Sequence, residues 1–335
     1  MTEFKLNRRQ FALMSGASVA TSIFMPAIAR AQAPKAIRLA HHLQLESEQH
    51  IAAEAFATKV NDYSDGALEV TVLPAGQMGG QREIVESISL GLLEMGYGES
   101  GIYSSYVSQF GILALPYMYK DFDQWQRVVD GPVGQDLAAK LQAAGNIKIV
   151  NTLMAGYRST FLRTRPIKTP EDFDGVKIRL PEAPAFVKTF AALGASPTPI
   201  PAPEMYSALQ TGVVDAMEGS LETGFTYKIY EVCKYLSLTR HILNDGSFII
   251  NNDFLNGLTV EEQDAISRAG ADVALEQRAS HFDRTATWLK RLGEEGGITI
   301  NEPNLVPFQQ KLAALQEEFA AEAGATELLA QIRAA

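Results

Sequence analysis

Two arginines in apolar surroundings carry the clearest chemistry in this sequence. Arg158 stands in the segment GYRSTFL, and Arg179 stands in KIRLP, at the end of a strand-like run. A charge in such a segment is costly unless it is paired. An arginine at a strand end can hold a carboxylate through two parallel N–H···O bonds. The pattern leaves two interpretations open: a clamp for an acidic ligand, or an internal ion pair with Asp172, Asp174 or Glu182.

Other sequence signals for chemistry are weak. Residues 96–101 read GYGESG and match G-x-G-x-x-G, but the following residues show no clear helical face, so a strand-end loop is favoured over a nucleotide site. The five histidines lack metal-ligand spacing, and no nucleophile elbow occurs after the N-terminal segment. Cys233 is the one cysteine, which excludes an intrachain disulfide. The sequence therefore predicts no catalytic residue, no metal and no cofactor.

The elements that would position the arginines alternate between strand and helix. The hydrophobic patterns predict strands over residues 36–42, 68–73, 92–97, 147–153, 248–251 and 298–300, with Arg158 and Arg179 on two more. Helices are predicted over 48–63, from 81 to near 91, and over 123–129, 134–144, 185–193, 203–211, 221–235, 259–292, 305–324 and 326–333. Such α/β units bind ligands beyond the carboxyl ends of their strands.

Composition bounds the class of protein. The chain has 335 residues, of which 46% are hydrophobic and 20% are charged, and this describes a globular protein with a sizeable core. The net charge of −10 argues against a nucleic-acid partner. Residues 1–31 contain NRRQFAL, an apolar stretch and Ala-Arg-Ala, which predicts a twin-arginine signal peptide cleaved near Ala31 and export to the periplasm. Twin-arginine export often serves cofactor-bearing enzymes, so a periplasmic oxidoreductase stays the alternative function.

A series of motifs resembles one protein family from about residue 37 to the C-terminal LVPFQQKL. They are FATKVNDYSDG, VTVLPAGQMGG, ILALPYMY, GYRSTFLRTRPI, DFDGVKIRLPE, LGASPTPIPAPEMYSALQTGVVDAMEG and YEVCKYLSLTRHIL. In this order they are similar to the solute-binding proteins of tripartite ATP-independent periplasmic (TRAP) transporters, the DctP family, in its C4-dicarboxylate and sialic-acid-binding class.

The resemblance implies an α/β fold of the two-lobed, type II-like periplasmic-binding-protein kind, with mixed sheets, interlobe hinge strands and long C-terminal helices. We expect lobe I over residues 34–155 and 245–285, lobe II over 156–244 and 286–312, and C-terminal helices at 313–335. It also implies a non-enzymatic protein that captures a small carboxylate and delivers it to the small and large TRAP membrane subunits. Family members are mostly monomers, with some dimers.

The family's binding positions map onto named residues here. The principal carboxylate-binding arginine of the K-I-R-x-P motif is Arg179, and a second ligand arginine is Arg158. Other pocket positions of the sialic-acid-binding relatives fall on His42, Gln81, Tyr97, Glu99, Ile102, Ala202 and Gly219.

Two departures bear on ligand choice. The family's D-G-Q-E-N-P reads DAMEGS here, so Gly219 stands where an amide usually contacts the ligand, and Ala202 stands where an aromatic is common. With His42, Gln81 and Ile102 they argue against sialic acid and predict more room. Sugar acids, hydroxy or aromatic acids and dicarboxylates stay open as ligands.

Overall fold

The structure is a computed structural model that describes residues 33–335, and Pro34–Ala335 form one compact unit. The predicted signal peptide of residues 1–31 lies outside the described residues. In the described part of the chain, none of the helices combines the length and apolarity needed to cross a membrane.

A ten-stranded mixed sheet organises the unit, with the strand order β2-β1-β3-β9-β5-β8-β6-β7 and with β4 and β10 also paired to β9. Its strands are β1 (Lys35–Ala40), β2 (Leu68–Leu73), β3 (Met95–Gly98), β4 (Ile147–Ile149), β5 (Leu153–Leu162), β6 (Lys177–Leu180), β7 (Ser196–Pro199), β8 (Ala216–Ser220), β9 (Tyr235–Asn251) and β10 (Thr299–Asn301).

Helices cover the sheet. They are α1 (Glu48–Tyr63), α2 (Gln81–Ser89), α3 (Ser100–Tyr103), α4 (Phe122–Asp130), α5 (Pro132–Gly145), α6 (Pro184–Ala192), α7 (Met205–Thr211), α8 (Leu221–Thr226), α9 (Ile229–Val232), α10 (Asn252–Asn256), α11 (Val260–Glu294), α12 (Val306–Glu322) and α13 (Thr326–Ala334). Short 3-10 turns are η2 (Ser108–Ala114), η3 (Pro170–Phe173) and η4 (Ala202–Glu204).

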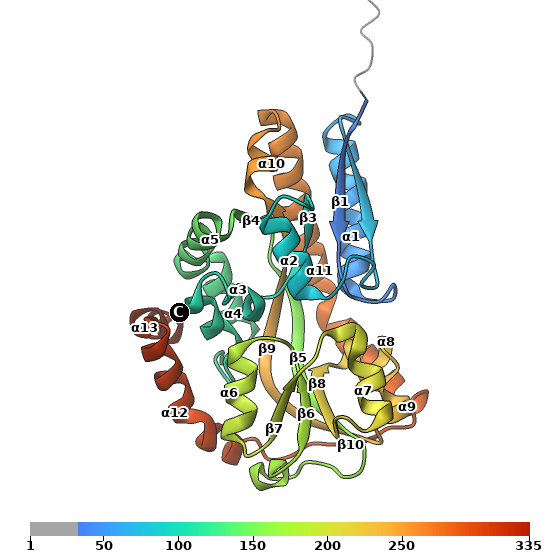
Figure 1. Ribbon diagram of the computed structural model, residues 1–335, viewed down its shortest axis with the longest axis vertical. Coiled ribbons are helices and arrows are strands. Elements are labelled where there is room, and N and C mark those ends of the chain that lie inside the picture. The colour runs from blue at the N-terminus through green and yellow to red at the C-terminus, as the bar shows by residue number, and fades with distance from the viewer. Residues whose placement is uncertain (1–32) are drawn as a thin grey trace, which may run out of the picture. The chain divides into compact units, whose positions relative to one another are not determined.

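Two long strands join the halves of the sheet, as Figure 1 shows along the middle of the unit. β9 pairs with β3 and β4 through its C-terminal half and with β5 through its N-terminal half. The half with β1–β3 is called the first lobe below, and the half with β6–β8 the second lobe. This is the two-lobed α/β fold with interlobe strands that the sequence predicts, while the lobe bounds in the chain stay a prediction.

Local chemistry explains the best-predicted elements. Ser47 caps α1 by accepting the backbone N–H of His50 at 3.1 Å, and Phe56 and Val60 on its inner face are fully buried. Thr259 and Glu262 form a capping box that opens the 35-residue helix α11. Two pairs of acids also stand in first turns, Glu171 and Asp172 in η3 and Glu261 and Glu262 in α11.

Five predictions were wrong in detail. Residues 221–235 are not one helix, because Lys228 takes a left-handed φ of 56° between α8 and α9, and β9 then begins at Tyr235. The strand over 248–251 is only the end of this 17-residue strand. The strand over 147–153 is divided into β4 and β5, and the strand over 92–97 begins only at Met95. The first strand ends at Ala40, before the two histidines.

Candidate functional site

A cavity with about 500 Å³ of empty space lies between the two lobes. First-lobe residues from the segments after β1, at the start of α2 and after β3 form one wall, and second-lobe residues around β5, β6 and η4 form the other. The lining consists of His42, Leu43, Gln81, Glu99, Ile102, Arg158, Arg179, Pro181, Glu182, Pro201, Ala202, Thr223 and Tyr227. Seven residues that the sequence singled out therefore meet at one place, namely His42, Gln81, Glu99, Ile102, Arg158, Arg179 and Ala202.

Strand register brings the two arginines to the same cavity. On β5, Arg158 lies opposite Ser220 of β8, and on the parallel pair β6 and β8, Arg179 lies opposite Met217. β8 stands between β5 and β6 in the sheet, so the two arginines come from strands on either side of it. The sequence placed both arginines on strands correctly.

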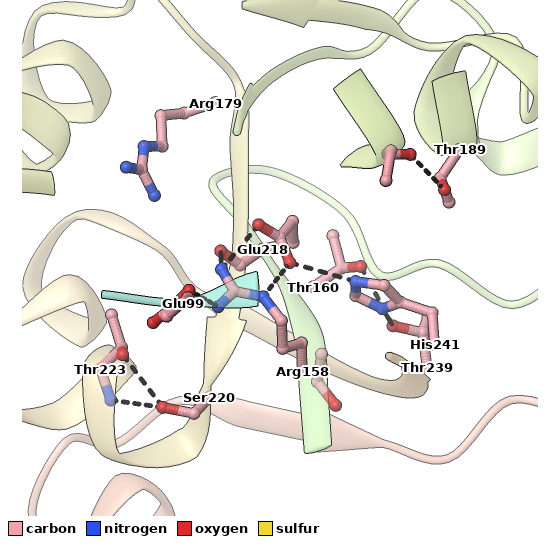
Figure 2. A network of polar contacts seen from close by, with 12 residues as sticks. Glu99, Arg158, Thr160, Arg179, Thr189, Glu218, Ser220, Thr223, Thr239 and His241 are labelled. Atoms are coloured by element: carbon pink, nitrogen blue, oxygen red, sulfur yellow. Dashed lines mark hydrogen bonds and ion pairs between the residues drawn. The ribbon is translucent and has the colours of Figure 1, made fainter. Parts of the chain in front are cut away.

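Arg158 has a buried acidic partner. Its Nε donates to Oε2 of Glu218 at 2.6 Å and its Nη2 donates to Oε1 at 2.8 Å, with Glu218 fully buried (Figure 2). Burial opposes the charge on both residues, yet their attraction outweighs it: the pKa of Glu218 falls to about 2 and that of Arg158 rises. Neither Asp172, Asp174 nor Glu182 is the partner. Asp172 pairs with Arg165 instead, and Glu182 pairs with Arg82.

Further groups extend this ion pair. His241 Nε2 lies 3.2 Å from Oε2 of Glu218, and its Nδ1 lies 2.8 Å from the hydroxyl of Thr239. The guanidinium of Arg158 also stacks over the ring of Phe186, with its Cζ 5.0 Å from the ring centre. These contacts restrain Arg158 to one orientation. Figure 2 shows its bonds to Glu218 and the contact between Glu218 and His241.

Arg179 has no such partner. Its side chain is 4% exposed, its Nε donates to the carbonyl oxygen of Ile200 at 2.7 Å, and its Nη1 lies 3.6 Å from Sδ of Met205. No acidic side chain within residues 33–335 forms an ion pair with it, and Figure 2 shows it standing apart from Glu218. Burial lowers the pKa of Arg179 to about 10, so it remains charged at neutral pH. The site therefore holds one buried guanidinium that has no ion-pair partner in the described chain.

The first-lobe wall of the cavity, which faces the two arginines, carries the uncharged side chain of His42. Burial, with the neighbouring His41, Arg179 and Arg158, lowers the pKa of His42 to about 3, so its ring is uncharged at neutral pH. Nδ1 of His42 and Nε2 of Gln81 are buried, and within residues 33–335 neither has a hydrogen-bond partner. Unsatisfied buried groups of this kind are uncommon in native proteins, and a ligand can satisfy them.

Glu99 adds an acid to this wall. It is 9% exposed, and one carboxylate oxygen lies 3.8 Å from Nη1 of Arg158. Burial raises the pKa of Glu99 above the usual range, although Arg158 opposes the shift. Glu99 thus lies within reach of a bound molecule, on the wall opposite Arg179.

Tyr97 and Gly219 do not line the cavity. Tyr97 is buried behind His42, with ring centres 6.1 Å apart, and its hydroxyl has no hydrogen-bond partner among the described residues. At Gly219, a Cβ atom would lie 2.7 Å from Cε of Met217 and 3.5 Å from Cγ2 of Thr223. Met217 and Thr223 therefore take up part of the space that the sequence predicts to be free there.

The sequence-based prediction missed several residues that line the cavity. Pro181 and Glu182 follow directly after β6, so their place at the end of the strand of Arg179 was a usable signal. Tyr227 donates its hydroxyl to the carbonyl oxygen of His42 at 2.6 Å and so links the two walls. No sequence pattern pairs residues 42 and 227. Leu43, Pro201 and Thr223 complete the set.

The G-x-G-x-x-G glycines serve close packing. A Cβ at Gly96 would lie 2.9 Å from the carbonyl oxygen of Ala40, and one at Gly101 would lie 2.9 Å from the ring of Phe186. A helix does begin inside the motif, contrary to the prediction, but α3 spans only four residues. Within residues 33–335, no group of three His, Cys, Asp or Glu side chains is placed to hold a metal ion.

Comparison with known proteins identifies the family of the chain. The family model for bacterial extracellular solute-binding protein, family 7 (DctP), matches residues 39–323. The sialic acid-binding periplasmic protein SiaP of Vibrio cholerae is 30% identical over 295 residues, which cover 88% of this chain and 91% of that protein. The 2,3-diketo-L-gulonate-binding periplasmic protein YiaO of Escherichia coli is 29% identical over 252 residues, or 75% of each chain.

Solved structures show the same fold. A TRAP periplasmic solute-binding protein from Sulfitobacter, with bound β-D-galacturonate, superposes with a TM-score of 0.85 at 28% identity and covers 89% of this chain and 99% of its own. The sugar acid-binding protein DctPAm of Advenella mimigardefordensis, in complex with galactonate, gives the same TM-score and identity and covers 89% and 97%. The chain therefore belongs to the family 7 bacterial extracellular solute-binding proteins, the DctP family of periplasmic TRAP transporter components.

Proposed function

We propose that this protein binds a sugar monocarboxylate, or a closely related hydroxy acid, and that the carboxylate pairs with Arg179. The observation that carries the proposal is the buried guanidinium of Arg179, which faces the cavity between the lobes and has no acidic partner in residues 33–335. A buried cation without a counter-charge is unfavourable, so an anion that enters the cavity is strongly stabilised.

The charge balance favours a single carboxylate. Arg158 is already neutralised by Glu218, so it steadies the ligand carboxylate without supplying a second free charge. At the other wall, Glu99 would repel a second carboxylate but would accept hydrogen bonds from hydroxyl groups, as would a neutral His42. Gln81 can donate to the same hydroxyls. These contacts favour a polyhydroxy monoacid over a dicarboxylate.

Relatives with solved structures bind acids of this class. Their ligands include β-D-galacturonate, galactonate and, in a Polaromonas protein, D-erythronate. In this chain Ala202 and Ile102 give the cavity an apolar part, while Tyr97 supports His42 from behind. Thr223 would bound the ligand at the start of α8, with Gly219 and Met217 packed behind it.

Transport then follows from closure of the lobes. Ligand that bridges both walls favours the closed arrangement, and the closed form would dock on the small and large TRAP membrane subunits. The protein would act without catalysis, as a monomer or a dimer, with lobe bounds as the sequence predicts. Export by the twin-arginine route, with cleavage near Ala31, completes the proposal.

A thermal-shift screen tests the ligand class. We expect D-galacturonate, D-glucuronate, D-galactonate or D-erythronate to raise the melting temperature, since a ligand at 100 times its Kd adds ~2.7 kcal/mol to the unfolding free energy. Neutral galactose is the matched control and should leave the temperature unchanged. The proposal would be refuted if galactose stabilised the protein as much as the acids do, or if none of the acids raised the melting temperature.

A further inference from the structure

Two buried carboxyl groups meet where α1 of the first lobe contacts α8 of the second. Glu48, the first residue of α1, is 2% exposed, and Glu222 of α8 is 8% exposed. The backbone N–H of Glu48 donates to Oε1 of Glu222 at 3.1 Å. Both residues also line one small gap between α1, α8 and α11. The ligand cavity does not include either of them.

The two carboxyl groups have different surroundings. Glu48 accepts hydrogen bonds from Nε2 of Gln277 at 3.2 Å and Nε1 of Trp288 at 3.4 Å, and its Oε2 lies 3.1 Å from Nδ1 of His281. All three partners come from α11. Glu222 forms no ion pair with a Lys, Arg or His side chain in residues 33–335, and its hydrogen bond comes from the backbone of Glu48. Three side chains of α11 therefore contact the carboxyl group of Glu48, whereas no Lys, Arg or His side chain in residues 33–335 pairs with that of Glu222.

Other charged or titratable groups around the pair do not remove this difference. Those that face it are His281, Arg284 and Glu276 from α11, Tyr157 from β5, Tyr97 from β3 and Tyr227 after α8. Arg284 acts on Glu222 only at a distance. Burial, followed by the nearby Glu48, therefore raises the pKa of Glu222 well above its ordinary value.

The position of the pair couples it to the ligand cavity. α1 follows the segment that carries His42, and α8 follows directly after β8, which carries Glu218 and Gly219. Tyr227, just beyond α8, bonds to the carbonyl oxygen of His42 at 2.6 Å. Separation of the two walls would therefore break the contact between Glu48 and Glu222 together with the contact between Tyr227 and His42.

We propose that Glu222 is a proton-dependent closing contact: with a proton on its carboxyl group, α8 rests against α1, and loss of that proton drives the two helices apart. The reason is that two neighbouring carboxylates repel each other when both are ionised, and burial strengthens that repulsion. When the lobes separate, both groups regain water and the repulsion disappears. This inference goes beyond ligand binding, and it holds whichever acid enters the cavity.

The sign of the pH effect follows from linkage. The closed form binds one proton more than the open form at any pH between the ordinary pKa of a glutamic acid and the raised pKa of Glu222. The equilibrium constant for closure is thus highest on the acid side and falls about tenfold per pH unit across that window. Above the raised pKa, the contribution of this contact to closure is lost.

Distances between two spin labels, measured by electron paramagnetic resonance on the ligand-free protein, test whether lobe closure depends on pH. Spin labels at Glu54→Cys on α1 and Gln210→Cys on α7 report the separation of the lobes, since both positions are exposed. The native Cys233 is buried, and burial raises the pKa of its thiol to about 12, so it stays unlabelled. We expect the fraction of molecules with the short label-to-label distance of the closed form to fall as the pH rises from about 5 to about 9.

Two variants separate the proposed contact from general pH effects. Glu222→Gln, which is neutral and keeps a hydrogen-bond acceptor, should keep the short distance at every pH. Glu276→Gln is the matched control, because Glu276 lies nearby on α11 but is exposed and paired to Lys59 at 3.0 Å, and it should titrate like the wild type. The proposal would be overturned if the distance between the labels did not change with pH in the wild type, or if it changed with pH in Glu222→Gln as it does in the wild type.

Infrared spectroscopy of the wild-type protein gives a second measurement that needs no folded Glu222 variant. A protonated carboxyl group has a C=O stretch that an ionised one lacks, and we expect one such band to persist at neutral pH and to vanish on alkaline titration in step with lobe opening. Absence of any protonated carboxyl band at neutral pH would contradict the proposal, even if Glu222→Gln failed to fold.

Discussion

Arg158 and Glu218 form a bidentate ion pair inside the second lobe, with N–O distances of 2.6 and 2.8 Å. Arg179, on a strand close by, makes no such pair with any acid in residues 33–335. The two arginines are therefore not equivalent. The first is held and neutralised by the protein, and the second keeps its charge for a ligand.

Removal of Arg158 should destabilise the fold. Arg158→Ala leaves Glu218 buried and unpaired, which should lower the unfolding free energy by ~3–5 kcal/mol in urea denaturation. The double variant Arg158→Met/Glu218→Leu removes both charges and should recover most of that loss. Arg240→Ala is the control, because its pair with Glu302 is exposed and should matter by less than ~1 kcal/mol. Equal stability of Arg158→Ala and Arg240→Ala would contradict the assigned role.

Glu99 should select against a second carboxylate. Glu99→Gln removes a negative charge from the wall opposite Arg179 while it keeps the size of the side chain. Isothermal calorimetry should then show the affinity for galactarate, a dicarboxylate, rising about tenfold or more relative to galacturonate. Glu182→Gln also removes an acid from the lining and serves as the control. An unchanged ratio in Glu99→Gln would exclude Glu99 as the selecting group.

Acid should destabilise the protein through the two buried histidines. Burial is the main cause that lowers the pKa of His41 to about 4 and that of His42 to about 3. Since the unfolded chain binds these protons at a pH near 6.5, stability should fall from about pH 6.5 downward, by a few kcal/mol in all. The ion pair of Arg158 adds to this loss only from about pH 4.5 downward, where the unfolded chain protonates Glu218 while the folded pair, with the pKa of Glu218 at about 2, does not.

Urea midpoints measured between about pH 7 and about pH 4 would check this, since each histidine that protonates on unfolding adds to the slope. The variant His42→Gln should flatten the dependence by removing one titrating group. The same slope in wild type and variant would show that other groups control acid stability.

Gly98 should resist substitution because of close packing. A Cβ at this position would lie 2.6 Å from Cε1 of Tyr103, so Gly98→Ala should cost ~1–3 kcal/mol in thermal or urea unfolding. Gly293→Ala in α11 is the control, because its Cβ would lie 3.5 Å from Ile300, an ordinary contact, and alanine favours a helix. A loss in both variants, or in neither, would argue against the packing explanation.

Periodicity predicted the regular elements well. The helix over 48–63 and the strand over 68–73 match α1 and β2. Buried residues recur along α1, and in β2 the exposed Glu69 and Thr71 alternate with less exposed apolar residues. β9 was missed over most of its length. It is buried almost throughout and carries His241, Asn244 and Asp245, so neither alternation nor an apolar run marks it as a strand.

The sequence predicted only part of the site, because some of its contacts depend on tertiary structure. Arg179 stood out because a charge in an apolar strand is costly, and the resemblance to the family supplied the facing wall. Glu218 as the partner of Arg158 was not predicted, because the contact joins residues 60 positions apart through the register of β5 and β8. The contact between Tyr227 and His42 is likewise a product of tertiary structure and leaves no local signal.

Calorimetric titration of Arg179→Ala with the acid that stabilises the wild type most tests the central claim most directly. Loss of a buried ion-pair partner should weaken binding by ~3–5 kcal/mol, on the order of 10²–10³-fold or more in Kd, while the unfolding free energy without ligand stays the same or rises. Arg179→Lys keeps the positive charge but not the planar guanidinium that can bond to both carboxylate oxygens, so it should lose less affinity. An unchanged Kd in Arg179→Ala would contradict the claim that Arg179 holds the ligand carboxylate.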